Sequence, residues 1–169
     1  MKITRDELIL RRVAREIPCD TSVLLGPGLP ERLVDFRPPA SCLRLLRETP
    51  VAAEQVWDVV VTGAVEVSSR GDLVHSPGQD LEWIQARRWI VAGYLLQGGT
   101  GKLLVRECRY PITRRQCVHL VVTEFGVIGI TPVGFELREL APGAAADAVR
   151  LAVGGSLHVA DDLKLMSVA

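Results

Sequence analysis

Four short runs of valine, isoleucine and leucine constrain the fold of this chain more than any other feature. The runs lack the apolar–polar alternation of a strand that has one wet face. They cover Asp58–Thr62, Trp89–Leu95, His119–Thr123 and Gly126–Thr131. Continuous apolar strands are typical of a sheet that is covered on both faces. We therefore predict an α/β fold of three layers, an open and mostly parallel sheet with helices on both faces.

Local patterns predict where the helices of these layers begin and end. Thr4 and Glu7 have the spacing of a capping box, and apolar residues then recur at helical spacing until Pro18. A second helix is expected over Gln79–Arg88. One or two helical turns are expected over Val51–Asp58.

The stretch Val121–Gly143 predicts two strands joined by a tight turn. Pro132, Val133 and Gly134 separate the run Gly126–Thr131 from a second apolar segment, Phe135–Glu139. Turn residues between two such runs indicate a hairpin. A helix over Ala144–Val153 is expected to follow it.

Bulk composition excludes several classes of protein. A chain of 169 residues suits one domain, residues 1–169, and its 20 basic and 20 acidic residues cancel, so nothing favours a nucleic-acid partner. The chain lacks an apolar leader and an 18-residue apolar window, which predicts neither secretion nor a membrane span.

The cysteine and histidine positions predict neither a metal site nor a catalytic triad. The cysteines fit no common zinc spacing and no disulfide scaffold, so we expect reduced thiols in a cytoplasmic protein. They are Cys19, Cys42, Cys108 and Cys117. His119 begins an apolar strand and is expected to be packed or hydrogen-bonded rather than to act as a base.

Two glycine-rich segments imitate nucleotide-binding motifs without matching them. Gly98–Lys102 lacks the distant glycine and the following Ser or Thr of a P-loop, so it is interpreted as a turn between strands. Gly26-Pro27-Gly28 has Glu31 at the third glycine position of the dinucleotide fingerprint, and its proline removes an N–H that would face a phosphate.

Five segments, in this order, carry a resemblance to a known family. They are Leu24–Pro30 (LLGPGLP), Gly63–Val74 (GAVEVSSRGDLV), Ala86–Val91 (ARRWIV), Lys102–Thr113 (KLLVRECRYPIT) and Thr123–Gly143. Together they resemble the B (beta) subunit of class I CoA-transferases over most of the chain. The resemblance implies that family's α/β fold, which is related to ribose-5-phosphate isomerase and glucosamine-phosphate deaminase.

The resemblance also implies a reaction and a partner. The family transfers CoA between an acyl-CoA and a carboxylic acid through a glutamyl-CoA intermediate, with CoA as substrate and without a cofactor. Its active site lies between subunits, which implies an A-type subunit or a homo-oligomer as partner.

The family's nucleophile is the glutamate of a Ser-Glu-Asn-Gly motif after the second strand. Cys42–Pro50 (CLRLLRETP) stands at that place, and Glu48 is the candidate nucleophile. The motif is degraded, because Arg47, Thr49 and Pro50 replace its serine, asparagine and glycine.

Two further segments bear on the same site. Gly26 and Gly28 are the candidates for a loop that binds substrate or CoA. A second family loop, Gly-Met-Gly-Gly-Ala-Met-Asp, is shortened here to the residues between Pro77 and Ala86, without its glycine cluster.

Three functions therefore stay open at the level of sequence. The chain is a CoA-transferase component with Glu48 as nucleophile, or a non-catalytic structural or regulatory relative. The third alternative reuses the pocket for other acyl-CoA chemistry, such as hydrolysis or decarboxylation.

Overall fold

A computed structural model describes residues 2–36, 41–50, 52, 54–78, 80–99 and 101–167 of the chain. Within these ranges, no helix is both long and apolar enough to cross a membrane.

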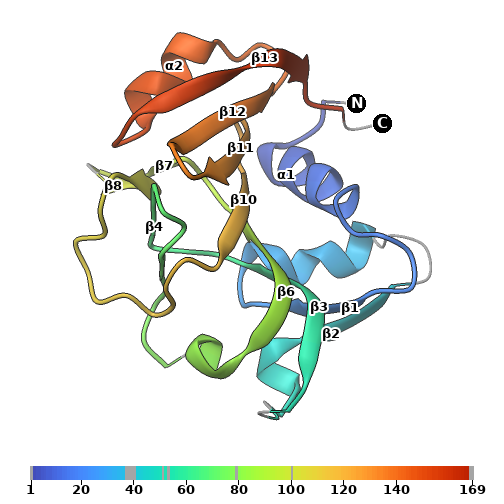
Figure 1. The fold of residues 1–169 in the computed structure, drawn as a ribbon. Helices are drawn as coiled ribbons and strands as arrows, with labels where there is room; N and C mark the ends of the chain where they lie inside the picture. Colours follow the sequence, from blue (N-terminus) through green and yellow to red (C-terminus); the bar gives the residue numbers. More distant parts are fainter. Residues whose placement is uncertain are drawn as a thin grey trace.

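The largest element in the described residues is an eight-stranded sheet with strand order β13-β12-β11-β10-β6-β3-β1-β2 (Figure 1). Its strands are β1 (Ser22–Leu25), β2 (Cys42–Leu45), β3 (Val56–Thr62), β6 (Gln85–Ala92), β10 (Val118–Val122), β11 (Gly126–Thr131), β12 (Gly134–Leu140) and β13 (Leu157–Leu165). All neighbours pair in parallel except β11, which is antiparallel to both β10 and β12. The prediction of an open, mostly parallel sheet is confirmed.

One face of this sheet is covered by helices. They are α1 (Arg5–Ala14) and the 3-10 helix η1 (Leu29–Phe36). The predicted capping box starts α1, since Thr4 Oγ1 accepts the Glu7 N–H at 3.2 Å and Glu7 accepts the Thr4 N–H at 3.0 Å. Ile9 and Leu10 of α1 are fully buried in the core on this face.

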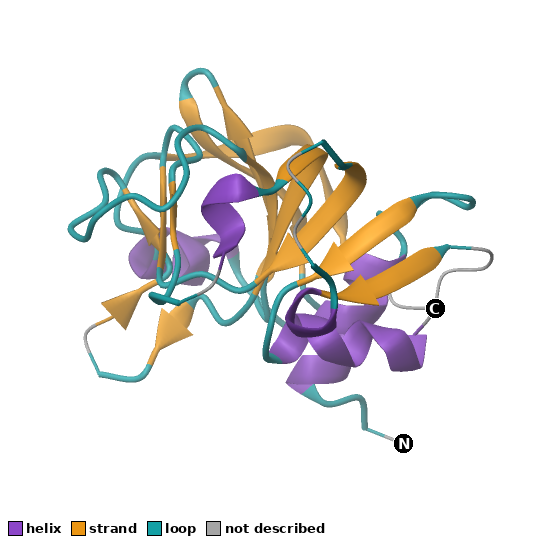
Figure 2. Cartoon of the chain, turned by 90° about the horizontal axis from the view of Figure 1, so that it is seen from below, coloured by secondary structure: helices purple, strands orange, loops and turns teal. Residues whose placement is uncertain are grey.

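The other face is covered mainly by short strands and loops (Figure 2). They are β4 (Glu66–Ser68), β5 (Leu73–Val74), β7 (Leu96–Gln97), β8 (Gly101–Lys102), β9 (Leu104–Val105), the 3-10 helices η2 (Leu46–Glu48) and η3 (Asp80–Trp83), and α2 (Ala146–Ala152). Val149 of α2 and Val67 of β4 are buried together in the second core cluster. Helices therefore lie on both faces, as predicted, although strands form most of this layer.

The predicted hairpin and the predicted glycine turn are both confirmed. β11 and β12 pair across a turn in which Gly134 has φ +119, a conformation that favours glycine. Strands β7 and β8 flank the glycine-rich turn near Gly99, whose φ is +80.

Two segments that were predicted to be helical are mostly strand. The helix expected over Gln79–Arg88 is only the 3-10 turn η3, and Gln85–Arg88 belong to β6; Gln79 lies outside the described residues. Pairing with β3 overrides the local preference here, because Val56 and Val59 align with Gln85 and Arg88. The helical turns expected over Val51–Asp58 are wrong from Val56 onward, because β3 starts there and pairs with β6.

Candidate active site

The carboxyl ends of the parallel strands bring the predicted site residues to one edge of the sheet. β2, β1 and β3 are neighbours, with Leu25 aligned to Leu45 and to Val61. Gly26 directly follows β1, and η2, which carries Glu48, directly follows β2. In open α/β sheets, ligands bind in the crevice outside this edge.

Backbone geometry explains both glycines of the loop after β1. Gly26 donates its N–H to the Val61 carbonyl at 2.8 Å, and a Cβ added to it would stand 2.7 Å from Thr62 Oγ1. Gly28 has φ +85, in the left-handed region, and directly precedes η1. Glycine is therefore required at Gly26 by close packing and at Gly28 by conformation.

Glu48 lies close in the fold to the glycine loop and points outward. Its side chain is 62% exposed, and its Oε1 lies 3.6 Å from Arg47 Nη2. Arg47 in turn donates Nε to Glu31 Oε1 at 2.9 Å. Glu31 is the third residue after Gly28, so Arg47 links the loop after β1 to η2.

Thr49, next to Glu48, closes a tight turn. The Thr49 hydroxyl donates to the Leu45 carbonyl at 2.7 Å, and the Thr49 N–H donates to the Leu46 carbonyl at 3.2 Å. Thr49 therefore stabilises the short helix that presents Glu48.

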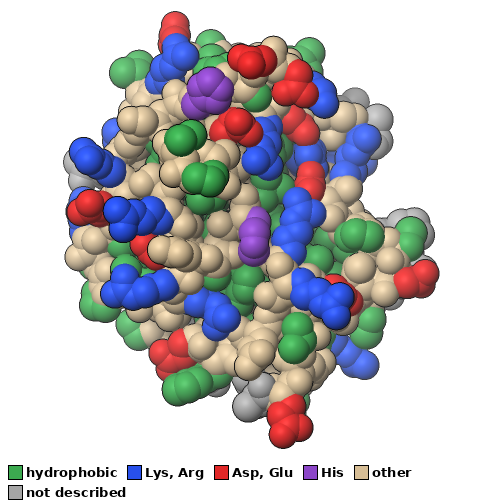
Figure 3. Space-filling view, viewed as in Figure 1, with side chains coloured by type: hydrophobic (Ala, Val, Ile, Leu, Met, Phe, Trp, Pro, Cys, Tyr) green, Lys and Arg blue, Asp and Glu red, His purple; other side chains and the backbone are tan. Residues whose placement is uncertain are grey.

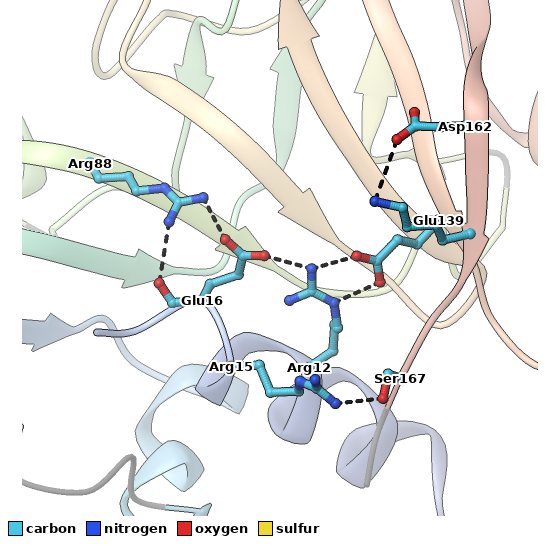
Figure 4. Close-up of polar contacts among 8 residues, drawn as sticks. Arg12, Arg15, Glu16, Arg88, Glu139, Asp162 and Ser167 are labelled. Carbon is cyan, nitrogen blue, oxygen red and sulfur yellow. Dashed lines mark hydrogen bonds and ion pairs between the residues drawn. The ribbon is translucent and has the colours of Figure 1, made fainter. Parts of the chain in front are cut away.

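A buried ion network lies elsewhere, between α1 and the strands, and the sequence did not predict it (Figure 4). Arg12 donates Nε and Nη2 to the two carboxylate oxygens of Glu139, both at 2.7 Å, and Nη2 to Glu16 at 2.5 Å. Arg88 donates Nη2 to the second oxygen of Glu16 at 2.6 Å. Charges of both signs gather on this face around a cavity of about 490 Å³ (Figure 3).

The network changes the pKa of its members. The hydrogen bond to Glu139 raises the pKa of Arg12 and outweighs the opposing effect of burial. Burial alone would raise the pKa of Glu16, but hydrogen bonds from Arg12 and Arg88 lower it below its ordinary value. Both shifts favour the charged forms of Arg12 and Glu16, whose ion pairs join α1 to the sheet.

His119 fills a bulge in the ladder between β6 and β10. The register shifts between Val118 and Leu120, and the Trp89 N–H donates to His119 Nδ1 at 3.1 Å. Burial and the Arg88 charge lower the pKa of His119. The prediction of a hydrogen-bonded histidine is confirmed.

The cysteines form neither a disulfide nor a metal site in the described part of the chain. All four are free, and burial raises the pKa of Cys117 to about 12 and that of Cys108 to about 11. Among the described residues, no group of three or more His, Cys, Asp or Glu side chains is placed to hold a metal ion.

Sequence comparison finds relatives that are CoA-transferase subunits of the B (beta) type. The chain is 23% identical to the B-type subunit of 3-oxoadipate CoA-transferase from Acinetobacter baylyi, covering 92% of this chain and 95% of the relative. That alignment spans 209 positions, more than the 169 residues of this chain, so part of the relative has no counterpart here. No family model matches the chain.

Solved structures of CoA-transferases and of a decarboxylase share the fold. An acyl-CoA transferase of Escherichia coli O157:H7 is similar with a TM-score of 0.80 at 19% identity, over 99% of this chain and 44% of that one. A variant of the decarboxylase AibA/AibB is similar with a TM-score of 0.78 at 19% identity, over 99% and 91% of the two chains. The chain is therefore similar in sequence to CoA-transferase subunits of the B (beta) type and shares the fold of CoA-transferases.

Proposed function

We propose that residues 1–169 act as a single B-type domain of a CoA-transferase, which moves CoA from an acyl-CoA to a carboxylic acid with Glu48 as nucleophile. CoA is a substrate in this scheme, and no cofactor is required. The partner is an A-type subunit or a second copy of this chain. The reduced thiols favour the cytoplasm as the compartment.

The position of Glu48 is the observation that carries this proposal. Glu48 is presented by η2 directly after β2, beside the glycine loop that follows β1. A nucleophile must stand where a substrate carbonyl can approach it, and the carboxyl edge of parallel strands is such a place. At Gly28 nothing lies within 4 Å of the place a Cβ would take, so CoA or acyl groups can lie against this backbone.

The proposed reaction is a sequence of acyl exchanges on Glu48. Its carboxylate attacks the thioester carbonyl, which gives an acyl-glutamyl anhydride and CoA thiolate. The thiolate attacks the glutamyl carbonyl, which gives a glutamyl-CoA thioester and releases the first acid. The acceptor carboxylate then attacks that thioester, and the expelled thiolate attacks the new acyl carbonyl, which restores Glu48.

The exposure of Glu48 supports a site that a second chain completes. Anhydride and thioester intermediates need protection from water and donors for the developing oxyanion. A side chain that is 62% exposed has little such protection within this chain. A partner that covers η2 and the glycine loop would supply the missing wall.

Chemical trapping tests the proposal. The chain is purified with an A-type subunit from the same genome and incubated with a panel of acyl-CoA esters. Intact-mass spectrometry is then expected to find a CoA adduct on this chain that hydroxylamine removes, and peptide mapping is expected to place it on Glu48.

Matched variants separate chemistry from folding. Glu48→Gln should abolish the adduct, because an amide cannot form the thioester by this route. Glu54→Gln changes an exposed carboxylate six residues away and should leave the adduct intact. An assembled complex that forms no adduct with any ester would exclude the glutamyl mechanism and leave the non-catalytic role.

A second candidate function has its own observation. The structural likeness to the decarboxylase AibA/AibB shows that this fold accommodates chemistry other than CoA transfer. If the complex consumes acyl-CoA and the Glu48→Gln variant keeps that turnover, the chain belongs with a decarboxylase or hydrolase activity instead.

A further inference from the structure

A cavity of about 630 Å³ lies on the strand-rich face, away from the ion network. One wall is the segment after β5, which carries His75 and Pro77, and the facing wall is Tyr110–Thr113. The apolar surface of the cavity includes Val65, Val74 and Ile112. The volume falls within the range of small-molecule pockets, about 300–1,000 Å³.

The walls are held in place without any ligand. Glu66 is almost fully buried and accepts two hydrogen bonds from Arg109, from its N–H at 2.8 Å and its Nε at 2.7 Å. The His75 N–H donates to Thr113 Oγ1 at 2.9 Å, and the Thr113 N–H donates to the Leu73 carbonyl at 2.9 Å. The two walls are therefore fixed to β4, β5 and each other, which makes the cavity preformed.

The ring of His75 offers a hydrogen-bond acceptor at this cavity. Its Nδ1 lies 3.3 Å from the Ser76 carbonyl oxygen, which can only accept, so Nδ1 carries a proton. Burial lowers the pKa of His75, which favours the neutral ring at pH 7. In the neutral ring Nε2 carries a lone pair, and no group of the described residues is seen to donate to it. A ligand that donates a hydrogen bond would complement it.

The charges around the cavity favour a cation. Among the described residues that line it, Glu82 is the one acidic side chain, and it is exposed. Arg109 is committed to Glu66, and Arg114 is held by the Glu82 carbonyl oxygen at 3.1 Å and by the Trp89 ring. A protonated amine therefore meets a carboxylate and an imidazole acceptor here.

We propose that this cavity binds a small primary amine with an apolar body, which packs against Val74 and Ile112 while its ammonium group donates to His75 and Glu82. Glu48 is not among the residues that line this cavity, and amine binding can be measured without CoA transfer.

A series of probes with one body and three head groups tests the proposal. Nitrogen-15-labelled protein is titrated with 2-phenylethylamine, 2-phenylethanol and 3-phenylpropanoate, and backbone amide shifts are followed by NMR. We expect saturable shifts clustered at residues 65, 74–76, 78, 110, 112 and 113, with affinity falling from the amine to the alcohol to the carboxylate.

Two variants assign the polar contacts. Glu82→Gln should weaken the amine about fivefold, as expected for a partly exposed ion pair, and leave the alcohol unchanged. His75→Phe keeps a flat ring and should weaken both ligands about fivefold by removing the acceptor. Glu54→Gln and His158→Phe change residues outside the cavity and should change neither affinity.

Three outcomes would overturn the proposal. They are shifts that do not saturate or that cluster elsewhere, equal affinity for the three head groups, and a Glu82→Gln variant that binds the amine like Glu54→Gln. If His75→Phe does not fold, the exposed Glu82 variant still decides the matter.

Discussion

Replacing Arg12 by methionine tests what the buried ion network contributes to the fold. The Arg12 side chain is only 9% exposed, and methionine keeps most of its apolar stem while removing the guanidinium group. The change deletes both hydrogen bonds to Glu139 and the one to Glu16. Two carboxylates, each 18% exposed, then lose a counter-charge.

The expected loss follows from the burial of these partners. Removing one member of a buried ion pair costs about 3–5 kcal/mol, because the other charge stays desolvated. Glu16 keeps Arg88 as a partner, and both carboxylates retain some access to water, which places the loss near the lower end. We predict a fall of about 3 kcal/mol in the free energy of unfolding. With a urea m-value of about 2 kcal/mol per M, the midpoint should fall by about 1.5 M.

Equilibrium unfolding in urea, followed by circular dichroism, measures this loss. Arg12→Met combined with Glu139→Gln should recover about 1–2 kcal/mol of it, since the orphaned charge is gone, and the double-mutant cycle reports the coupling. Arg87→Met is the control. Its Nε lies 4.0 Å from Asp58 in an exposed pair, so no measurable change in midpoint is expected.

The reasoning is refuted if Arg12→Met moves the midpoint no further than Arg87→Met does. It is also refuted if the double variant is as unstable as the single one, because the cost would then arise from lost packing rather than from an unpaired carboxylate.

Three further predictions follow from particular residues. The pKa of Glu16 is lowered, so its contribution to stability is complete above its ordinary pKa and is lost as pH falls through the lowered value. Urea midpoints should therefore drop at the acid end of a series from about pH 7 to pH 3. A midpoint that does not change with pH would contradict this. Gly28→Ala should lower thermal stability by about 1 kcal/mol, since φ +85 strains an L-residue, and an unchanged melting temperature would show that the loop relaxes. Iodoacetamide at mildly alkaline pH should alkylate the exposed Cys19 and Cys42 and spare Cys117, because the pKa of Cys117 is raised to about 12. Mass spectrometry of the labelled protein measures this. Rapid labelling of Cys117 would contradict the prediction and indicate local opening.

Sequence patterns predicted those parts of the fold that depend on neighbouring residues. The capping box at Thr4 and the hairpin around Gly134 are confirmed because their determinants lie within a few positions of one another. The predicted helix before Trp89 failed for the opposite reason. Its residues are held by β3, a strand distant in sequence, and Arg88 is fixed by Glu16. Pairing with distant strands determines the secondary structure of such segments, and local sequence preferences do not reveal that pairing.

The same distinction separates the two polar centres of the molecule. Gly26, Gly28 and Glu48 were candidates for one site by the family resemblance, and the structure shows that they follow two neighbouring parallel strands, β1 and β2. The network of Arg12 and Glu139 was not predicted, because its partners are 127 residues apart and the family segment that contains Glu139 does not indicate a partner for it. The register between β11 and β12 also shifts at Val127 and Ile128, so the position of Glu139 could not be derived by counting residues from the hairpin turn.

These contrasts bear on how much activity the isolated chain can have. The ion pairs of Arg12 join α1 to the sheet, whereas the proposed nucleophile Glu48 is exposed and lies 3.6 Å from Arg47. A carboxylate in contact with water is fully solvated, so it is a poor nucleophile and its acyl intermediates would hydrolyse. Activity by the glutamyl route therefore requires that a second chain bury Glu48. In that case the edge of the sheet that is proposed to carry the chemistry would also be the edge at which a partner binds.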